Sequence, residues 1–184
     1  MLKIKYNAPA VLSFCLLSLL ALGLNWLTGG WANAHLFSVY RASFSDPLTY
    51  LRFFTHVLGH AGYSHYIGNI VFLLVIGPAL EEKYGSGRLL AVMAVTALVS
   101  GLIQFIFFPG TALLGASGIV YMMIVLSSFF GSRGGGIPMT LILVMLLYIG
   151  GEIIDMIFVS DNISQLTHII GGIIGAVTGF ALRK

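Results

Sequence analysis

A serine in the stretch LGASGIVY, Ser117, stands among small residues in an otherwise apolar part of the chain. The hydrophobic pattern breaks just before it, so Ser117 is predicted to begin a helix. The first backbone N–H groups of a helix have no partner and lie at the positive end of the dipole, so they can stabilise an oxyanion beside the hydroxyl. Serine is also a favoured N-cap, and this stretch alone favours a simple cap over a nucleophile.

The base that could activate this serine is His168, one of five histidines, at the start of the apolar stretch THIIGGIIGAVTGF. A serine hydroxyl is a weak nucleophile without such a base. Gly171, Gly175 and Gly179 follow on roughly the same helix face, and small residues at that spacing let two helices pack closely. If the partner is the helix that begins at Ser117, a Ser–His dyad results. The alternative is an interfacial histidine beside ordinary packing glycines.

A second polar cluster lies in HVLGHAGYSHYIGN, which contains His56, His60, His65 and Asn69. His65 and Asn69 are four residues apart and share one helix face. Both can donate hydrogen bonds without burying a full charge, so they suit an oxyanion site completed by the backbone N–H of Ser117. Zinc binding by the histidines is the alternative. The chain has no H-E-x-x-H arrangement, and His60 and His65 are five apart, so we predict no metal site.

The acidic residues do not supply a clear third member for the dyad. Glu152 and Asp155 lie near the end of a predicted apolar helix, where they could orient a partner or bond to loops; the sequence leaves this open. Glu81 and Glu82 follow another apolar segment at the opposite face of the membrane. They are expected to cap or pair in a loop rather than to take part in chemistry.

The composition indicates that these residues work inside a membrane. Of 184 residues, 58% are hydrophobic and only 8% are charged, too few to cover a water-facing surface. The single cysteine, Cys15, excludes an intramolecular disulfide. A net charge of +3 without a basic cluster argues against nucleic acid as a partner. The apolar N-terminal segment is long and lacks a clear cleavage site, so we interpret it as a retained span rather than a signal peptide.

Six apolar segments are predicted to form a bundle of membrane-spanning helices, because lipid cannot satisfy free backbone groups and the runs are too continuous for barrel strands. We expect one domain, 1–184, with an all-α integral membrane fold, no internal repeat and no additional soluble domain. The long first loop, about 28–64, is expected to fold into short helices in the membrane interface. The segments are Ala8–Leu27, His65–Leu80, Leu89–Phe108, Ser117–Phe130, Ile137–Phe158 and Leu166–Leu182.

The basic residues predict the orientation of this bundle. Only Arg41 and Arg52, of nine lysines and arginines, fall on the side of the first loop, so both termini are expected in the cytoplasm. The other seven are Lys3, Lys5, Lys83, Arg88, Arg133, Arg183 and Lys184. The segment from Ser117 spans roughly 21 Å, against about 30 Å of hydrocarbon. Ser117 should therefore lie below the outer surface, and the loop PGTALLGA must dip to meet it.

Together these motifs resemble those of the rhomboid intramembrane serine proteases. The matching elements are GASG at Gly115–Gly118, HAGYSHYIGN at His60–Asn69, the Gly77/Glu81/Gly85 series, His168 with Gly171 and Gly175, and Tyr121 one turn after Ser117. The resemblance covers essentially all six segments. The first loop departs from it, because Leu51 precedes Arg52 where family members often have Trp.

The resemblance implies a role for each of these residues. It implies Ser117 as nucleophile, His168 as general base, and an oxyanion site of His65, Asn69 and the Ser117 N–H. Tyr121 would pack beside the His168 ring, whereas His60, Arg52 and Glu81 would be structural. It also implies that substrate transmembrane helices are cut near the membrane surface, without cofactor or metal, at small residues near helix-weakening ones.

This interpretation carries further expectations about substrate entry and location. Substrates must unwind locally and enter laterally between spans, and the glycine pair in LLYIGGEII could let the fifth segment flex. A bacterial inner membrane is the expected location, with membrane lipids as neighbours. Two other functions stay open: a rhomboid-like protein that binds transmembrane helices without cutting them, and a small transporter or metal-handling protein.

Overall fold

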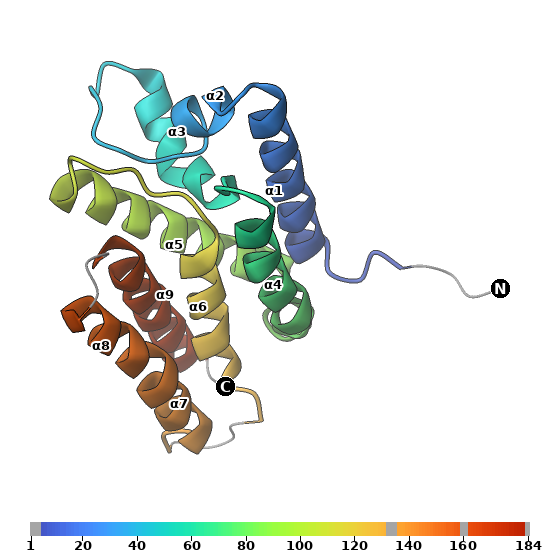
Figure 1. The fold of residues 1–184 in the computed structure, drawn as a ribbon. Coiled ribbons are helices and arrows are strands. Elements are labelled where there is room, and N and C mark those ends of the chain that lie inside the picture. The colour runs from blue at the N-terminus through green and yellow to red at the C-terminus, as the bar shows by residue number, and fades with distance from the viewer. Residues whose placement is uncertain (1–4, 132–135, 159–161, 183–184) are drawn as a thin grey trace.

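The structure is a computed structural model that describes residues 5–131, 136–158 and 162–182. The described part is helical, and its extended pairing is limited to one antiparallel bridge between Val39 and Leu113. Figure 1 shows the helices in chain order. They are α1 (Pro9–Leu27), α2 (Trp31–His35), α3 (Pro47–Thr55), the 3₁₀ turn η1 (His56–Leu58), α4 (Tyr63–Tyr84), α5 (Ser86–Phe107), α6 (Ser117–Ser127), α7 (Met139–Val144), the π turn η2 (Met145–Ile149), α8 (Gly150–Phe158) and α9 (Asn162–Ala181).

All six segments that the sequence predicted to be apolar helices are helical, with ends shifted by a few residues. Among the described residues, four helices have the length and composition to cross a membrane: Pro9–Leu27, Tyr63–Tyr84, Ser86–Phe107 and Ser164–Ala181. Two apolar helices are shorter, Ser117–Ser127 and Met139–Ile154. The prediction that the segment beginning at Ser117 is unusually short is therefore confirmed.

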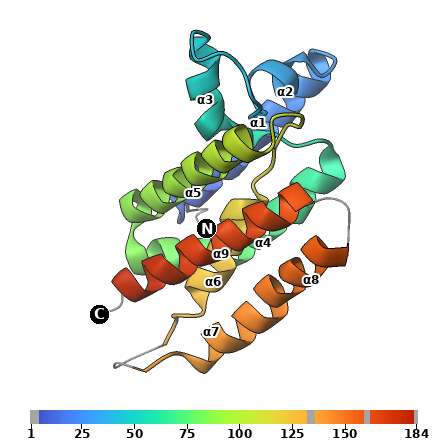
Figure 2. The same cartoon turned by 90° about the vertical axis from the view of Figure 1, so that its left-hand side faces the viewer.

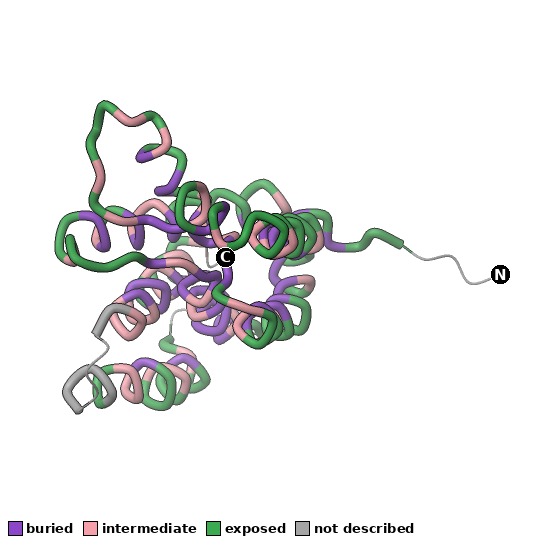
Figure 3. Tube along the Cα trace, turned by 45° about the horizontal axis from the view of Figure 1, so that its top comes forward, coloured by how far each residue is buried: buried purple, intermediate pink, exposed green. Residues whose placement is uncertain are grey.

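Helix α6 forms the centre of the molecule. Eight of its eleven residues are buried, and they face several directions around the helix, so α6 is covered by protein on most sides. Its neighbours are α4, α5 and α9, and α9 packs against it most extensively. Figure 2 shows α9 crossing α6, with α7 and α8 on the far side of the molecule from α1. The buried tube segments in Figure 3 concentrate around this centre.

The long first loop folds into α2, α3 and η1, which confirms the prediction of short helices there. Asp46 caps α3 by accepting the backbone N–H of Leu48 at 3.0 Å, and it pairs with the buried Arg52. Arg52 also donates to the hydroxyl of Tyr40 at 2.6 Å. Leu51 stands at the position where the proteins that this sequence resembles often have Trp. Its side chain is exposed and does not take part in this network.

At the opposite end of the bundle, a buried glutamate fixes the start of α1. The carboxylate of Glu81 accepts the backbone N–H groups of Ala10 and Val11 at 2.8 and 3.0 Å and the hydroxyl of Ser86 at 2.6 Å. It thereby satisfies donors that a helix N-terminus leaves free. The prediction that Glu81 caps or pairs is confirmed for the described contacts.

Two of the basic residues that the structure describes lie against opposite ends of the bundle, and the predicted orientation of the termini stays a prediction. Lys83, near the end of α4, donates to the carbonyl of Phe129 at 2.8 Å, beyond the C-terminal end of α6. Arg41, in the first loop, lies over the ring of Phe105, which is in the last turn of α5. Lys3, Arg133, Arg183 and Lys184, four of the seven residues behind the predicted orientation, lie outside the described residues.

Candidate active site

Ser117 begins α6 at the end of a loop that runs from α5 into the middle of the molecule (Figure 1). Other segments hold this loop. Val39 and Leu113 exchange two backbone hydrogen bonds of 2.9 Å, and the N–H of Gly115 donates to the carbonyl of His56 at 2.9 Å. Gly115 has φ +127°, a conformation that side chains rarely adopt. Irregular backbone inside a membrane protein requires such partners from the protein itself.

Helix α9 approaches α6 with backbone against backbone. A Cβ at Gly171 would overlap the carbonyl of Gly118, and one at Gly175 would overlap the carbonyl of Met122. One turn further on, a Cβ at Gly179 would overlap the ring of Phe129. The glycine stripe of α9 therefore faces α6, which is the partner that the sequence analysis considered for it.

This close packing brings His168 beside the first turns of α6. Its imidazole stacks on the ring of Tyr121, with the ring centroids 4.2 Å apart and the planes 2° apart. Tyr121 lies one helical turn after Ser117, so the residue on which the histidine stacks belongs to the first turns of α6. The preceding residue, Thr167, lies against Gly118, where a Cβ would meet its methyl group at 3.0 Å.

An acidic residue that the sequence could not assign also reaches this ring pair. Glu152, in the first turn of α8, accepts the hydroxyl of Tyr121 through Oε1. Its Oε2 lies 3.0 Å from Nδ1 of His168. Nδ1 of His168 has no hydrogen-bond partner among the described residues, so this second contact is a close approach of the carboxylate to the ring without hydrogen-bond geometry. The side chain of Asp155, the other acid named from the sequence, lies outside the described part of the chain.

His65, in the first turn of α4, lies against the loop before Ser117. A Cβ at Gly115 would be 2.9 Å from Cε1 and Nε2 of the His65 ring. The N–H of Ala61 donates to Nδ1 of His65 at 3.4 Å. Because Nδ1 accepts a hydrogen bond, the proton of the neutral ring belongs on Nε2. The nitrogen that faces Gly115 is therefore a donor.

Asn69 is buried one turn further along α4. Its Nδ2 donates to the carbonyl of His65 at 3.0 Å, within the same helix. A side-chain amide carries two N–H groups, so this bond uses one of them. The arrangement fixes the Asn69 side chain directly beneath His65.

His60 is fully buried before the start of α4 and supports His65. The two rings meet edge to face with centroids 5.1 Å apart. The spacing of five residues suggested different helix faces, but His60 precedes the helix, so helical periodicity does not apply to it. Burial lowers the pKa of His60 from 6.5 to about 4. A neutral ring whose Nδ1 lies 3.1 Å from the Leu58 carbonyl fits a structural role.

The sequence analysis did not consider a buried polar row on α5. Thr96, Ser100 and Gln104 are four residues apart and each almost fully buried. Ser100 Oγ lies 3.6 Å from the position of a Cβ on Gly118, next to Ser117. His56 lies on the same side, with Nε2 3.0 Å from the Ala97 carbonyl. Polar residues at this spacing within an apolar helix are the signal that could have revealed the row.

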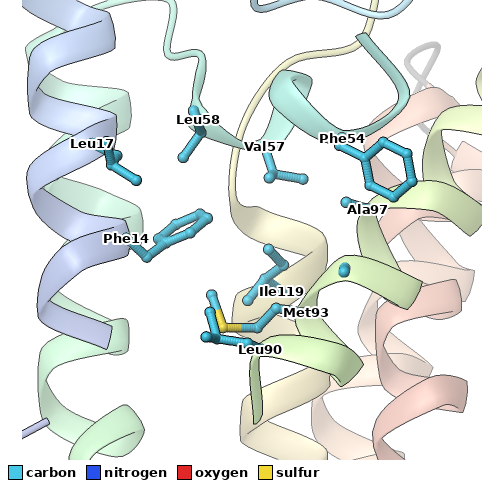
Figure 4. Close-up of a pocket in the computed structure, with 10 residues that line it drawn as sticks. Phe14, Leu17, Phe54, Val57, Leu58, Leu90, Met93, Ala97 and Ile119 are labelled. Atoms are coloured by element: carbon cyan, nitrogen blue, oxygen red, sulfur yellow. The ribbon is translucent and has the colours of Figure 1, made fainter. Parts of the chain in front are cut away.

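Other parts of the structure offer less chemistry. Among the residues described, no three His, Cys, Asp or Glu side chains gather closely enough to hold a metal ion. A pocket of about 230 Å³ between α1, η1, α5 and α6 is lined by apolar side chains such as Phe14, Met93 and Ile119 (Figure 4). It contains no acid, base or nucleophile.

The sequence of the chain is similar to that of known proteins. The family model described as the rhomboid domain matches residues 47–184. Rhomboid protease GlpG of Enterobacter sp. (strain 638) is 33% identical over 134 residues, which are 71% of this chain and 48% of that protein. Rhomboid protease GlpG of Salmonella paratyphi A is 32% identical over 133 residues, 70% of this chain and 47% of that protein. The chain thus matches about half the length of these relatives.

Proposed function

Because the chain belongs to the rhomboid family, we propose that it is an intramembrane serine endopeptidase with Ser117 as nucleophile and His168 as general base. The observation that carries this proposal is the stacking of His168 on Tyr121, one turn after Ser117. It supports the dyad because His168, 51 positions after Ser117 in the sequence, stacks on a ring one turn into the helix that Ser117 begins. A simple N-cap serine has no need of a histidine held there.

The reaction is acyl transfer to serine followed by hydrolysis. Nε2 of His168 accepts the proton of Ser117 Oγ as this oxygen attacks the carbonyl carbon of the scissile peptide bond. The protonated imidazole then donates its proton to the leaving amine, the C–N bond breaks, and an acyl-enzyme remains. Water attacks the ester with His168 again acting as base, which releases the new carboxylate and restores Ser117.

The oxyanion of each tetrahedral intermediate is stabilised by His65, Asn69 and the backbone N–H of Ser117. The Nε2 proton assigned to His65 and its proximity to Gly115 support this role. Gly115 and Gly118 allow the close approach of loop and helices, and Gly171 and Gly175 hold α9 against α6. Tyr121 fixes the plane of the base, and His60 supports the His65 ring.

The substrates we propose are transmembrane helices cut near the outer membrane surface, in the inner membrane of a bacterium. All six helical segments cross the bilayer in this proposal, with both termini in the cytoplasm, and the first loop lies on the outer side. A helical peptide bond is hydrogen-bonded and shielded, so the substrate must unwind before attack. Glycine or proline near the cut makes this unwinding less costly.

The test is labelling of detergent-purified protein with a fluorophosphonate probe, together with cleavage of a transmembrane peptide. The wild type should be labelled and should cleave, whereas Ser117→Ala should do neither and His168→Ala should lose at least about 100-fold in rate. Labelling that survives Ser117→Ala would identify a different serine as the nucleophile. A folded wild type that is not labelled but binds the peptide would indicate a helix-binding protein without protease activity.

A further inference from the structure

We propose that Glu152 is a positioning residue for the His168 base. Its carboxylate holds the imidazole with the proton on Nδ1, so that Nε2 is free to accept the proton of Ser117. This inference rests on the proposed protease function, and it adds an acidic member to a site for which the sequence offered only a dyad.

Each of the two carboxylate oxygens of Glu152 contacts one of the two stacked residues, Tyr121 and His168. Oε1 accepts the hydroxyl of Tyr121, and Oε2 lies 3.0 Å from Nδ1 of His168. The side chains of His168 and Glu152 are only 17% and 12% exposed, so water screens their interaction little.

The carboxylate selects one tautomer of the histidine. An ionised carboxylate has acceptors and no donor, so the neutral imidazole facing it carries its proton on Nδ1. Its lone pair is then on Nε2, the nitrogen that a base needs toward Ser117. When the ring takes up the serine proton, the nearby negative charge stabilises the imidazolium that forms.

The π turn explains how Glu152 comes to face these rings. Such a turn contains one residue more than an α turn, so it rotates all that follows by roughly 100° relative to an uninterrupted α-helix. The π turn η2 ends at Ile149, three residues before Glu152. Tyr148, within this turn, packs edge to face on Tyr121 with centroids 6.1 Å apart. The irregular segment thus presents both a ring and a carboxylate to the His168–Tyr121 pair.

A purely structural role is the competing explanation, since Glu152 could merely tie α8 to Tyr121. The test compares kcat and KM for a transmembrane peptide between wild type, Glu152→Gln and Glu152→Asp. Glu152→Gln keeps an acceptor for Tyr121 but loses the charge, so we expect kcat to fall at least about tenfold with KM within about twofold. Glu152→Asp keeps the charge and should recover part of this loss.

A matched control and a second background keep the test decisive. Glu82→Gln makes the same chemical change at an exposed position near the C-terminal end of α4, and it should leave kcat unchanged. Tyr121→Phe keeps the stacked ring and removes the hydroxyl that binds Glu152. If Glu152 acts on His168, Glu152→Gln should still cost about tenfold in the Tyr121→Phe background.

Two results would overturn the inference. One is a folded Glu152→Gln protein, with an unchanged unfolding midpoint, whose kcat stays within about twofold of wild type. The other is an effect of Glu152→Gln that disappears in the Tyr121→Phe background, because the glutamate would then act only as an anchor. A wild type that neither cleaves nor reacts with the fluorophosphonate probe would instead contradict the proposed function itself.

Discussion

The backbones of Gly171 and Gly118 touch, so closely that a Cβ on Gly171 would overlap the Gly118 carbonyl oxygen. These two residues lie close to the proposed catalytic pair in the sequence, since Gly118 follows Ser117 and Gly171 lies three residues after His168. The separation of α6 and α9 is therefore set at the level where the serine and histidine must meet. A change in this separation alters stability and chemistry together.

We predict that Gly171→Ala destabilises the protein and weakens its activity. The added methyl meets backbone rather than a flexible side chain, so the helices must move apart, at a cost of about 3 kcal/mol or more. His168 moves with α9, and the rates of probe labelling and peptide cleavage should both fall at least about tenfold. Thermal unfolding in detergent measures the first effect, and kinetics measure the second.

Gly68→Ala is the matched control for this substitution. Gly68 lies within α4, and a Cβ there has nothing within 4 Å. Alanine at such a position should leave activity unchanged and stabilise the helix by about 0.5–1 kcal/mol. Equal behaviour of Gly171→Ala and Gly68→Ala would show that the α6–α9 contact is looser than the structure has it.

The stability of the protein should fall as the pH falls from about 6.5 to about 4. His56 and His60 are 1% and 0% exposed, and burial lowers the pKa of each to about 4. In the unfolded chain these histidines protonate near pH 6.5, so between the two values the unfolded state binds protons that the folded state does not. Their contribution to stability is complete above pH 6.5 and is lost by pH 4.

Unfolding midpoints measured between pH 8 and pH 4 check this expectation. His60→Gln should reduce the slope in that window, whereas His35→Gln, at an exposed position in α2, should not. Asp46 adds to the loss only below about pH 5, because the N–H of Leu48 and the charge of Arg52 lower its folded-state pKa below the usual 3.8. A midpoint that stays constant from pH 6.5 to pH 4.5 would contradict the neutral state assigned to the two buried histidines.

The parts of the structure that were predictable are those that follow from local pattern. The apolar segments became helices because lipid-facing backbone must satisfy its own hydrogen bonds. The glycine stripe of α9 met α6 because a partner backbone can approach only where side chains are absent. A capping or pairing role of Glu81 was expected because it lies at the face opposite the predicted site, whereas its place in the last turns of α4 and its bonds to α1 were not.

The parts that were not predictable depend on one local irregularity of a helix, on the hydrogen-bond partner of a side chain, or on which helix faces pack together. Glu152 faces Tyr121 and His168 after a π turn that hydrophobic periodicity does not mark. Asn69 bonds to the carbonyl of its own helix, an option open to any asparagine in a helix and visible only with coordinates. Thr96, Ser100 and Gln104 share one face of α5, but the contact of this face with Gly118 depends on how the helices pack, which the spacing does not indicate.

The fifth apolar segment offers a test of lateral substrate entry. Gly150 and Gly151 follow the π turn, and alanine fits at both, since the nearest contact of an added Cβ is the Met145 carbonyl at 3.8 Å. The double variant Gly150→Ala/Gly151→Ala should therefore stiffen this segment without repacking it, and it should raise the free energy of unfolding by about 1–2 kcal/mol.

If the segment must flex to admit a transmembrane helix, this variant should cleave a membrane-embedded substrate at least about threefold more slowly. Labelling by the small fluorophosphonate probe should stay within about twofold of wild type, because the probe does not need the same opening. Gly23→Ala in α1, where an added Cβ meets nothing within 4 Å, controls for stiffening elsewhere. A more stable double variant that cleaves the embedded substrate at the wild-type rate would exclude flexing at the glycine pair as a step in entry.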